Sequence, residues 1–164
     1  MNFNQGDLVV HKNFGVGKVK SVEGVDFNES GSRPYYRVDF AATTVWVAVG
    51  EQPKGGLRPL TPKAQLKHYR TVLKSAPQAL DEQFRKRHAE LVSRLEAGSF
   101  QAVCEVVRDL SARAARKPLS SYEKNLLAQT RDLLSSEWAV ASGLSQAEAL
   151  SEIETCLLAG RSSV

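Results

Sequence analysis

Hydrophobic residues change their spacing near residue 60, and this change limits the possible folds more than any other feature of the sequence. Before it, short runs rich in β-branched and aromatic residues are separated by glycine-containing turns, which is typical of strands. After it, apolar residues recur every three or four positions, which indicates amphipathic helices. A chain of 164 residues is long enough for two small domains. We therefore predict an α+β protein with a β domain at residues 1–60 and a helical domain at residues 61–164.

The first domain has the strand pattern of a small barrel. Four runs have the composition of strands: residues 8–10, 16–22, 35–40 and 45–49. In the third run Tyr36, Val38 and Phe40 alternate with polar residues, as in a strand with one buried face. Four or five short strands are too few for a sandwich, but they suffice for a strongly bent barrel of the SH3 or Tudor type.

The second domain is predicted to be a compact group of five helices. Thr61 and Pro62 have the residue types of an N-cap followed by proline at the first helical position. The second and third helices are expected at about residues 79–96 and 100–116. The fourth and fifth are expected to open with capping boxes, formed by Ser120 with Glu123 and by Ser145 with Glu148. Two large aromatic residues are expected in the core of this domain: Trp138 and Tyr122.

The net charge of +4 is unevenly distributed. Residues 1–60 carry seven Lys/Arg and six Asp/Glu, residues 61–118 carry twelve and six, and residues 119–164 carry three and six. The surplus in the middle third indicates an anionic partner. Because no segment is apolar enough to enter a bilayer, nucleic acid is favoured over a membrane.

Two groups of residues in the basic middle third are candidate nucleic-acid contacts. The first group shares one face of a helix: Lys63, Lys67, Arg70 and Lys74. The second is a run of charge around one aromatic ring: Phe84-Arg85-Lys86-Arg87-His88. A basic helix face near an exposed aromatic ring can contact successive phosphates while the ring stacks against or inserts at a base step. The alternative is that both groups are ordinary solvated helix faces, since lysine and arginine are mostly exposed.

Enzymatic chemistry finds little support in the sequence. The stretch Gly15-Val16-Gly17 lacks the third glycine and the following helix of a nucleotide-binding loop, so a strand turn is favoured. Cys104 and Cys156 form no CxxC pair, and the histidines lack metal-ligand spacing to them. We expect both cysteines to be small buried hydrophobic residues, and we expect no metal and no cofactor. With no visible signal peptide, the chain is interpreted as a cytoplasmic binding protein rather than an enzyme.

Motifs in both halves of the chain point to one family. In the first half they are Phe3-x-x-Gly6-Asp7-x-Val9-Val10, Phe14-Gly15-Val16-Gly17 and Tyr35-Tyr36-x-Val38-Asp39-Phe40. In the second half they are Leu95-Glu-Ala-Gly98, Val106-Val107-Arg108-Asp109-Leu110, Leu119-Ser120-x-x-Glu123-Lys124 and Leu133-Leu134-x-x-Glu137. In this order and spacing they resemble the CarD/CdnL family of bacterial RNA polymerase-binding transcription regulators, over about residues 1–160.

The resemblance implies a mechanism. In this family the Tudor-like module docks on the β subunit of RNA polymerase, partly by adding a strand edge. The helical domain then faces promoter DNA near the −10 element, where a family tryptophan wedges into the minor groove and stabilises the open complex. The partners implied are the polymerase β subunit and promoter DNA, which is bound weakly and without sequence preference. A monomer that associates with the nucleoid through polymerase is expected.

The wedge position of the family falls on Phe84, which is a departure from tryptophan. Phenylalanine can still act as an apolar wedge, although it lacks the indole N–H. The alternative is a core residue, because Phe84 lies on the apolar side of its helix. The basic family positions that follow match Lys86 and Arg87, Arg85 is an additional cation, and Ala89 stands where the family has a lysine. Three earlier residues are further candidates for phosphate contacts: Lys67, Arg70 and Lys74.

The docking edge of the family falls on Val45-Trp46-Val47-Ala48, which departs from the family pattern at two positions. Trp46 replaces an arginine and Ala48 replaces a proline. Trp46 is expected either in the core or at the interface, where tryptophan is a common anchor. An alternative function is a polymerase-independent architectural DNA-binding protein that uses only the basic helices, which would leave the β domain without a role.

Overall fold

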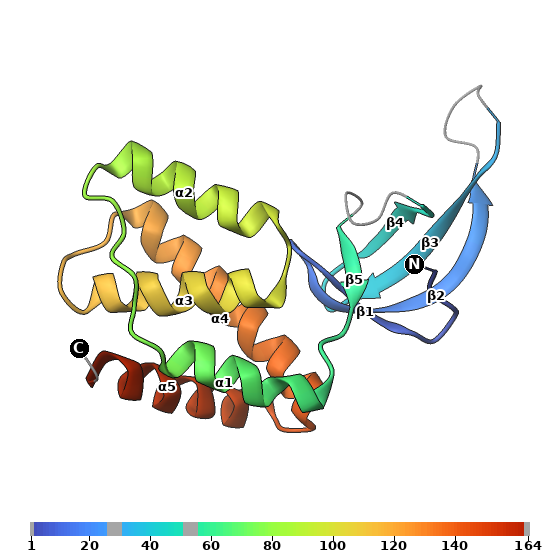
Figure 1. The fold of residues 1–164 in the computed structure, drawn as a ribbon. Coiled ribbons are helices and arrows are strands. Elements are labelled where there is room, and N and C mark those ends of the chain that lie inside the picture. Colours follow the sequence, from blue (N-terminus) through green and yellow to red (C-terminus); the bar gives the residue numbers. More distant parts are fainter. Residues whose placement is uncertain (1, 26–30, 51–55, 163–164) are drawn as a thin grey trace. The chain divides into compact units, whose positions relative to one another are not determined.

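The computed structural model describes residues 2–25, 31–50 and 56–162, and the chain divides into two compact units at residues 60 and 61 (Figure 1). The first unit is a β-sheet and the second is a group of helices. This arrangement confirms the predicted α+β class, with a Tudor-like β unit followed by five α-helices.

The β unit is a single antiparallel sheet of five strands in the order β4-β3-β2-β1-β5. The strands are β1 (Leu8–His11), β2 (Gly15–Val25), β3 (Arg33–Phe40), β4 (Thr44–Ala48) and β5 (Leu57–Pro59). The long strand β2 pairs with both β1 and β3 and changes register between Val19 and Ser21. Because such a bulge bends the strand and increases its twist, it helps a short sheet to wrap around its own core.

The core of the β unit lies on one face of the sheet. Its buried members come from the alternating positions expected of strands: Phe3, Val9, Val19, Tyr36, Val38, Phe40, Val47 and Leu57. Gly17 allows this packing, since a Cβ atom there would lie 2.6 Å from the ring of Phe40. The predicted alternation in the third strand is therefore confirmed, and it places the intervening residues on the outer face.

The helical unit is built around a central helix. Its elements are the 3₁₀ turn η1 (Lys63–Gln65) and the helices α1 (Leu66–Lys74), α2 (Phe84–Glu96), α3 (Phe100–Ala114), α4 (Ser121–Ser142) and α5 (Gln146–Ser162). Helix α3 packs against α1, α2, α4 and α5, and Figure 1 shows it between α1 and α2. The candidate residues of α1 and those of α2 therefore lie on opposite sides of α3.

Two cores hold these helices together. The larger one, around Trp138 and Phe100, joins α1, α3, α4 and α5. The smaller core packs α2 against α3. It is formed by Leu80, Leu91, Val106, Leu110 and Leu119. The expectations that Trp138, Cys104 and Cys156 are buried are confirmed. The expectation for Tyr122 is wrong, because 44% of its surface is exposed.

The two predicted capping boxes are present, but two other helix starts differ from expectation. Ser120 and Glu123 exchange hydrogen bonds between side chain and backbone, and Ser145 and Glu148 do the same. Thr61 does not cap the first helix. Its backbone N–H and its hydroxyl both donate to Glu137 Oε1, at 3.2 and 2.7 Å, and so tie the entry of the unit to α4.

Helix α2 begins at Phe84, later than the expected residue 79. The preceding residues run in an irregular path that carries Leu80 into the smaller core. Because the helix starts at Phe84 itself, no earlier turn covers that ring. Among the described residues, no helix is long and apolar enough to cross a membrane.

Candidate nucleic-acid interface

The segment that leads into α2 is anchored by a buried carboxylate on α3. Asp109 Oδ1 accepts hydrogen bonds from the Arg108 Nε–H at 2.8 Å and from the backbone N–H of Gln78 at 2.9 Å. Its other oxygen accepts from Arg94 Nη1, in the last turn of α2, at 2.7 Å. Because both cations and one backbone N–H converge on one acid, the approach to α2 and its far end are held to α3 together.

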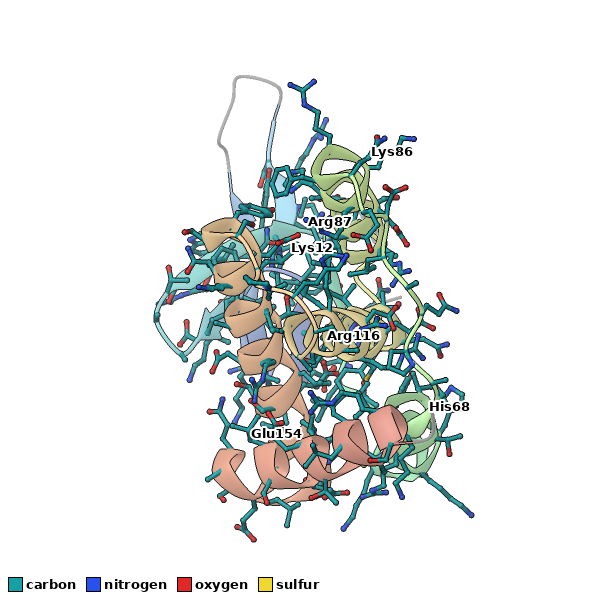
Figure 2. The ribbon with its side chains drawn as sticks, turned by 90° about the vertical axis from the view of Figure 1, so that its left-hand side faces the viewer. Lys12, His68, Lys86, Arg87, Arg116 and Glu154 are labelled. Atoms are coloured by element: carbon teal, nitrogen blue, oxygen red, sulfur yellow. The ribbon has the colours of Figure 1, made fainter. Side chains whose placement is uncertain are left out.

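The first turn of α2 presents Phe84 to solvent. Phe84 is 46% exposed, so the alternative of a core residue does not hold. Gln83 occupies the N-cap position, but among the described residues no side chain caps this end of the helix. Arg85 and Lys86 are exposed beside the ring, and Figure 2 shows Lys86 directed away from the helix. The start of α2 therefore carries an exposed aromatic residue followed by two exposed cations.

Unlike Lys86, Arg87 points into the protein, between α2 and α4 (Figure 2). Only 6% of the residue is exposed, and its Nε–H donates to Glu123 Oε1. Its Nη1 donates to the backbone carbonyls of Asp81 at 2.9 Å and Glu82 at 3.1 Å. With its Nε and Nη1 donors engaged and its charge matched by a buried acid, Arg87 is poorly placed to touch a phosphate. The structure therefore argues against the expectation that Arg87 contacts DNA directly.

Arg87 instead packs against the ring of Phe84 from inside the protein. Its guanidinium carbon lies 5.7 Å from the centre of the Phe84 ring, in cation–π contact. Residues three or four apart share a helix face. Arg87 follows Phe84 by three residues and precedes the buried Leu91 by four, so all three lie on one face of α2. This spacing on the apolar face is the signal in the sequence that could have indicated burial of Arg87.

The partner of Arg87 is itself fixed in place. Glu123 is buried, and its Oε2 accepts from the backbone N–H of Ser120 at 2.9 Å within the capping box. Burial by itself raises the pKa of Glu123, but the hydrogen bonds from Arg87 and Ser120 outweigh it and hold the pKa below its ordinary value. Glu123 is therefore ionised at neutral pH, and the start of α4 is fastened to the start of α2.

Helix α4 adds a second exposed ring to this region. Tyr122, next to Glu123, turns outward because successive helical residues are rotated by about 100°. Its ring centre lies 4.6 Å from that of His88, and His88 in turn is stacked on Phe84 at 5.9 Å. The prediction from sequence missed Tyr122 as a surface residue. No local pattern distinguishes it, since its exposure depends on how α4 meets α2.

The basic residues of α1 do not join this region. Lys67 and Lys74 are exposed on α1, across α3 from the start of α2. Arg70 is engaged: its Nε–H donates to Glu152 on α5, and its guanidinium carbon lies 5.6 Å from the centre of the Trp138 ring. Arg70 therefore contributes to the packing of α1 and α5, whereas Lys67 and Lys74 remain exposed to solvent.

The candidate docking edge of the β unit lies on β4. Among the described residues, β4 pairs only with β3, so its other side has no strand partner. Val47 is buried in the core, Val45 and Ala48 are partly buried, and Trp46 is 37% exposed on the outer face. Trp46 is opposite Arg37 in register, and the Arg37 guanidinium carbon lies 5.9 Å from the centre of its ring. The structure thus decides between the two alternatives for Trp46 in favour of the surface.

Both units match known families. Residues 3–61 match the CarD-like/TRCF RID domain, and residues 69–154 match the C-terminal domain of CarD. The two matches define a two-domain transcription regulator. The chain belongs to the CarD family, which confirms the resemblance seen in its motifs.

A curated relative agrees with this assignment. The chain is 26% identical over 145 residues to a protein of Bacillus subtilis (strain 168) named "Putative transcription factor YdeB". The aligned part covers 88% of this chain and 95% of the relative, so the two proteins share both units.

Proposed function

We propose that this transcription regulator binds the β subunit of RNA polymerase through its β unit and stabilises the open promoter complex through its helical unit. The observation that carries the proposal is Phe84, which is exposed at the start of α2 and is followed directly by the exposed cations Arg85 and Lys86. It stands at the position where the family has its wedge residue. In this role the protein acts as a monomer in the cytoplasm, at the nucleoid, wherever polymerase is engaged.

The polymerase contact is proposed at the β4 edge. The side of β4 that has no partner among the described strands offers backbone N–H and C=O groups to an incoming strand, which is the requirement for β-augmentation. Trp46 stands outward beside this edge with Arg37 against its ring, and tryptophan and arginine are the residues most enriched at interface hot spots. Val45, Val47 and Ala48 contribute their backbone to the edge, while the side chain of Val47 remains in the core.

The DNA contact is proposed at the start of α2. Phe84 enters the minor groove as an apolar wedge, and Arg85 and Lys86 neutralise phosphates on either side. Arg87 supports the wedge from within the protein instead of touching DNA. Lys67 and Lys74 are proposed only as secondary contacts for DNA that bends past α1, because α3 separates them from the wedge.

Energetically, the protein needs only a small preference for melted DNA. A ligand shifts an equilibrium by the difference in its affinity for the two states. About 1.4 kcal/mol of extra binding to the open complex lengthens its lifetime roughly tenfold when it acts on the collapse step. One inserted phenylalanine and two phosphate contacts are enough for an effect of this size.

The test is the half-life of open promoter complexes formed by the cognate polymerase. We expect the wild-type protein to lengthen the half-life and Phe84→Ala to lose most of that effect while still binding polymerase. Val92→Ala is a matched control, because Val92 is another exposed hydrophobic residue of α2, away from the first turn. It is expected to behave as wild type.

Two other results would contradict parts of the proposal. If Phe84→Ala lengthens the half-life as much as wild type, the cations carry the effect and Phe84 is not the wedge. If the wild-type protein binds DNA but leaves the half-life unchanged with bound polymerase, the architectural alternative replaces the proposal.

A further inference from the structure

Glu82, two residues before Phe84, pairs with cations that come from the end of another helix. Its Oε2 accepts a hydrogen bond from the Lys117 ammonium at 2.7 Å and lies 3.7 Å from Nη2 of Arg113. Arg113 lies in the last turn of α3, and Lys117 follows that helix. Figure 1 shows the end of α3 and the start of α2 at the same end of the helical unit. A carboxylate next to the proposed wedge therefore engages a second group of cations.

The backbone of Glu82 is held independently of its side chain. Its carbonyl accepts from Arg87 Nη1 at 3.1 Å, and the carbonyl of Asp81 accepts from the same nitrogen at 2.9 Å. Because Arg87 is itself anchored by the buried Glu123, these two carbonyls stay in place whatever the Glu82 side chain does. The carboxylate of Glu82 is therefore not required to position the start of α2.

The ion pair between Glu82 and Lys117 is exposed and easily exchanged. The Glu82 side chain is 70% exposed and the Lys117 side chain is 54% exposed. Exposed pairs of this kind contribute little to folding, because water and salt screen them. The hydrogen bond and the charge of Lys117 lower the pKa of Glu82, so its carboxylate is ionised at neutral pH. Another anion, such as a phosphate, can replace this carboxylate at little cost to the fold.

We propose that Glu82 is an internal competitor of DNA phosphates. In the free protein it occupies Lys117 and Arg113, and a phosphate that reaches the end of α3 must displace it to gain these cations. Glu82 thus limits the affinity of the helical unit for DNA. This inference rests on the proposed function and deepens it, because weak binding of free DNA leaves the choice of promoter to the polymerase.

The two cations are not equally available to a phosphate. Lys117 is half exposed, whereas the side chain of Arg113 is mostly buried. Release of Lys117 therefore adds one phosphate contact, which steepens the slope of log affinity against log salt concentration by about 0.9. It is expected to tighten binding by about fivefold, which is the upper end of what one exposed charge pair contributes.

The test uses the full chain without polymerase and measures fluorescence anisotropy of a labelled mixed-sequence duplex over a series of salt concentrations. We expect Glu82→Gln to bind this duplex about fivefold more tightly than wild type at low salt, with the steeper slope. Glu105→Gln is the matched control, because it removes the same charge from α3, where Glu105 accepts from Gln101. It is expected to tighten binding by less than about twofold, since salt screens a distant charge.

A second pair of variants separates competition from a general change in charge. In a Lys117→Gln background, Glu82→Gln is expected to tighten binding no more than Glu105→Gln does, because the main cation that Glu82 withholds is then absent. Thermal unfolding of each variant reports whether it is folded. If Glu82→Gln fails to fold, Glu82→Ala replaces it, since it removes the same charge.

Equal gains for Glu82→Gln and Glu105→Gln overturn the inference, and so does a gain from Glu82→Gln that persists in full without Lys117. The absence of measurable duplex binding by folded Glu82→Gln also overturns it. These failures are separable from failure of the proposed function. If Glu82→Gln gives no specific gain but Phe84→Ala still shortens the open complex lifetime, the inference fails and the proposed function stands. If the gain depends on Lys117 but wild type leaves that lifetime unchanged with bound polymerase, the competition stands and the proposed function fails.

Discussion

At the scale of single residues, the direction of the Arg87 side chain decides how the proposed site works. Its guanidinium is buried against Glu123, so Arg87→Ala leaves an uncompensated carboxylate between α2 and α4. Removing one partner of a buried ion pair costs about 3–5 kcal/mol. We expect this loss in the free energy of unfolding measured by urea denaturation. Arg85→Ala, two residues earlier and exposed, is expected to change it by less than about 0.5 kcal/mol. Similar values for both variants would contradict the structural role of Arg87.

The ion pair of Arg87 and Glu123 also predicts how the free energy of unfolding depends on pH. Because the pKa of Glu123 is lower in the folded protein than its ordinary value of 4.5, its stabilising contribution is complete above that value. The contribution is lost as the pH falls through the lowered pKa. We therefore expect the difference in unfolding free energy between wild type and Glu123→Gln to be largest at neutral pH and to shrink on acidification below pH 4.5. Urea denaturation over a pH series measures it, and a difference that grows in acid would contradict the assignment.

At the scale of elements, Asp109 of α3 positions α2. It accepts from Arg94, Arg108 and the backbone of Gln78. Asp109→Asn therefore leaves the buried Arg108 without its anion, while Arg94 keeps its ion pair with Glu90. We expect a loss of about 3–5 kcal/mol in unfolding free energy. We also expect Asp109→Asn to increase the hydrogen exchange rate of α2 above that of wild type, and to do so more than for α5. The reason is that α2 is held by the smaller core and α5 by the larger one.

Asp132→Asn on α4 is the control for this experiment, since Asp132 is an exposed acid whose side chain accepts from Gln146. It is expected to change the unfolding free energy by less than about 0.5 kcal/mol. Equal exchange rates in α2 of the wild type and of Asp109→Asn would show that the smaller core holds α2 without the buried carboxylate.

At the scale of the whole molecule, the two units are expected to contribute separate steps. Trp46→Ala removes an exposed anchor of the β unit and should weaken binding to polymerase by about 2 kcal/mol. Because that is a loss of affinity, saturating amounts of the variant should restore the full lifetime of the open complex. Phe84→Ala acts after docking, so its defect should persist at saturation. Titration of each variant against open complex half-life distinguishes the two patterns.

The double variant provides the control. If the units act independently, its binding to polymerase should equal that of Trp46→Ala, and its plateau half-life should equal that of Phe84→Ala. A plateau defect for Trp46→Ala alone would instead mean that the β unit contributes to the melted state itself.

Features set by short-range interactions could be predicted from the sequence. The change from period 2 to period 3.6 depends only on which side chains can share a strand face or a helix face, and it indicated the α+β class. The capping boxes of Ser120 and Ser145 link residues three apart, so their geometry is local as well. The start of α2 was misplaced because the residues before Phe84 follow contacts with Asp109 on α3 and not their own helical tendency.

The direction of individual side chains at the proposed site was decided by tertiary structure. Arg87 turns inward because Glu123, 36 positions away, supplies a buried partner. Tyr122 and Trp46 turn outward because of where α4 meets α2 and where β4 ends the sheet. Whether a side chain is exposed depends on which other element packs against its own, and a sequence pattern describes only the element that contains it. By itself the sequence therefore determined the class of fold and the region of the proposed site, while the contact of α2 with α4 determined which side chains of that region are exposed and which are buried.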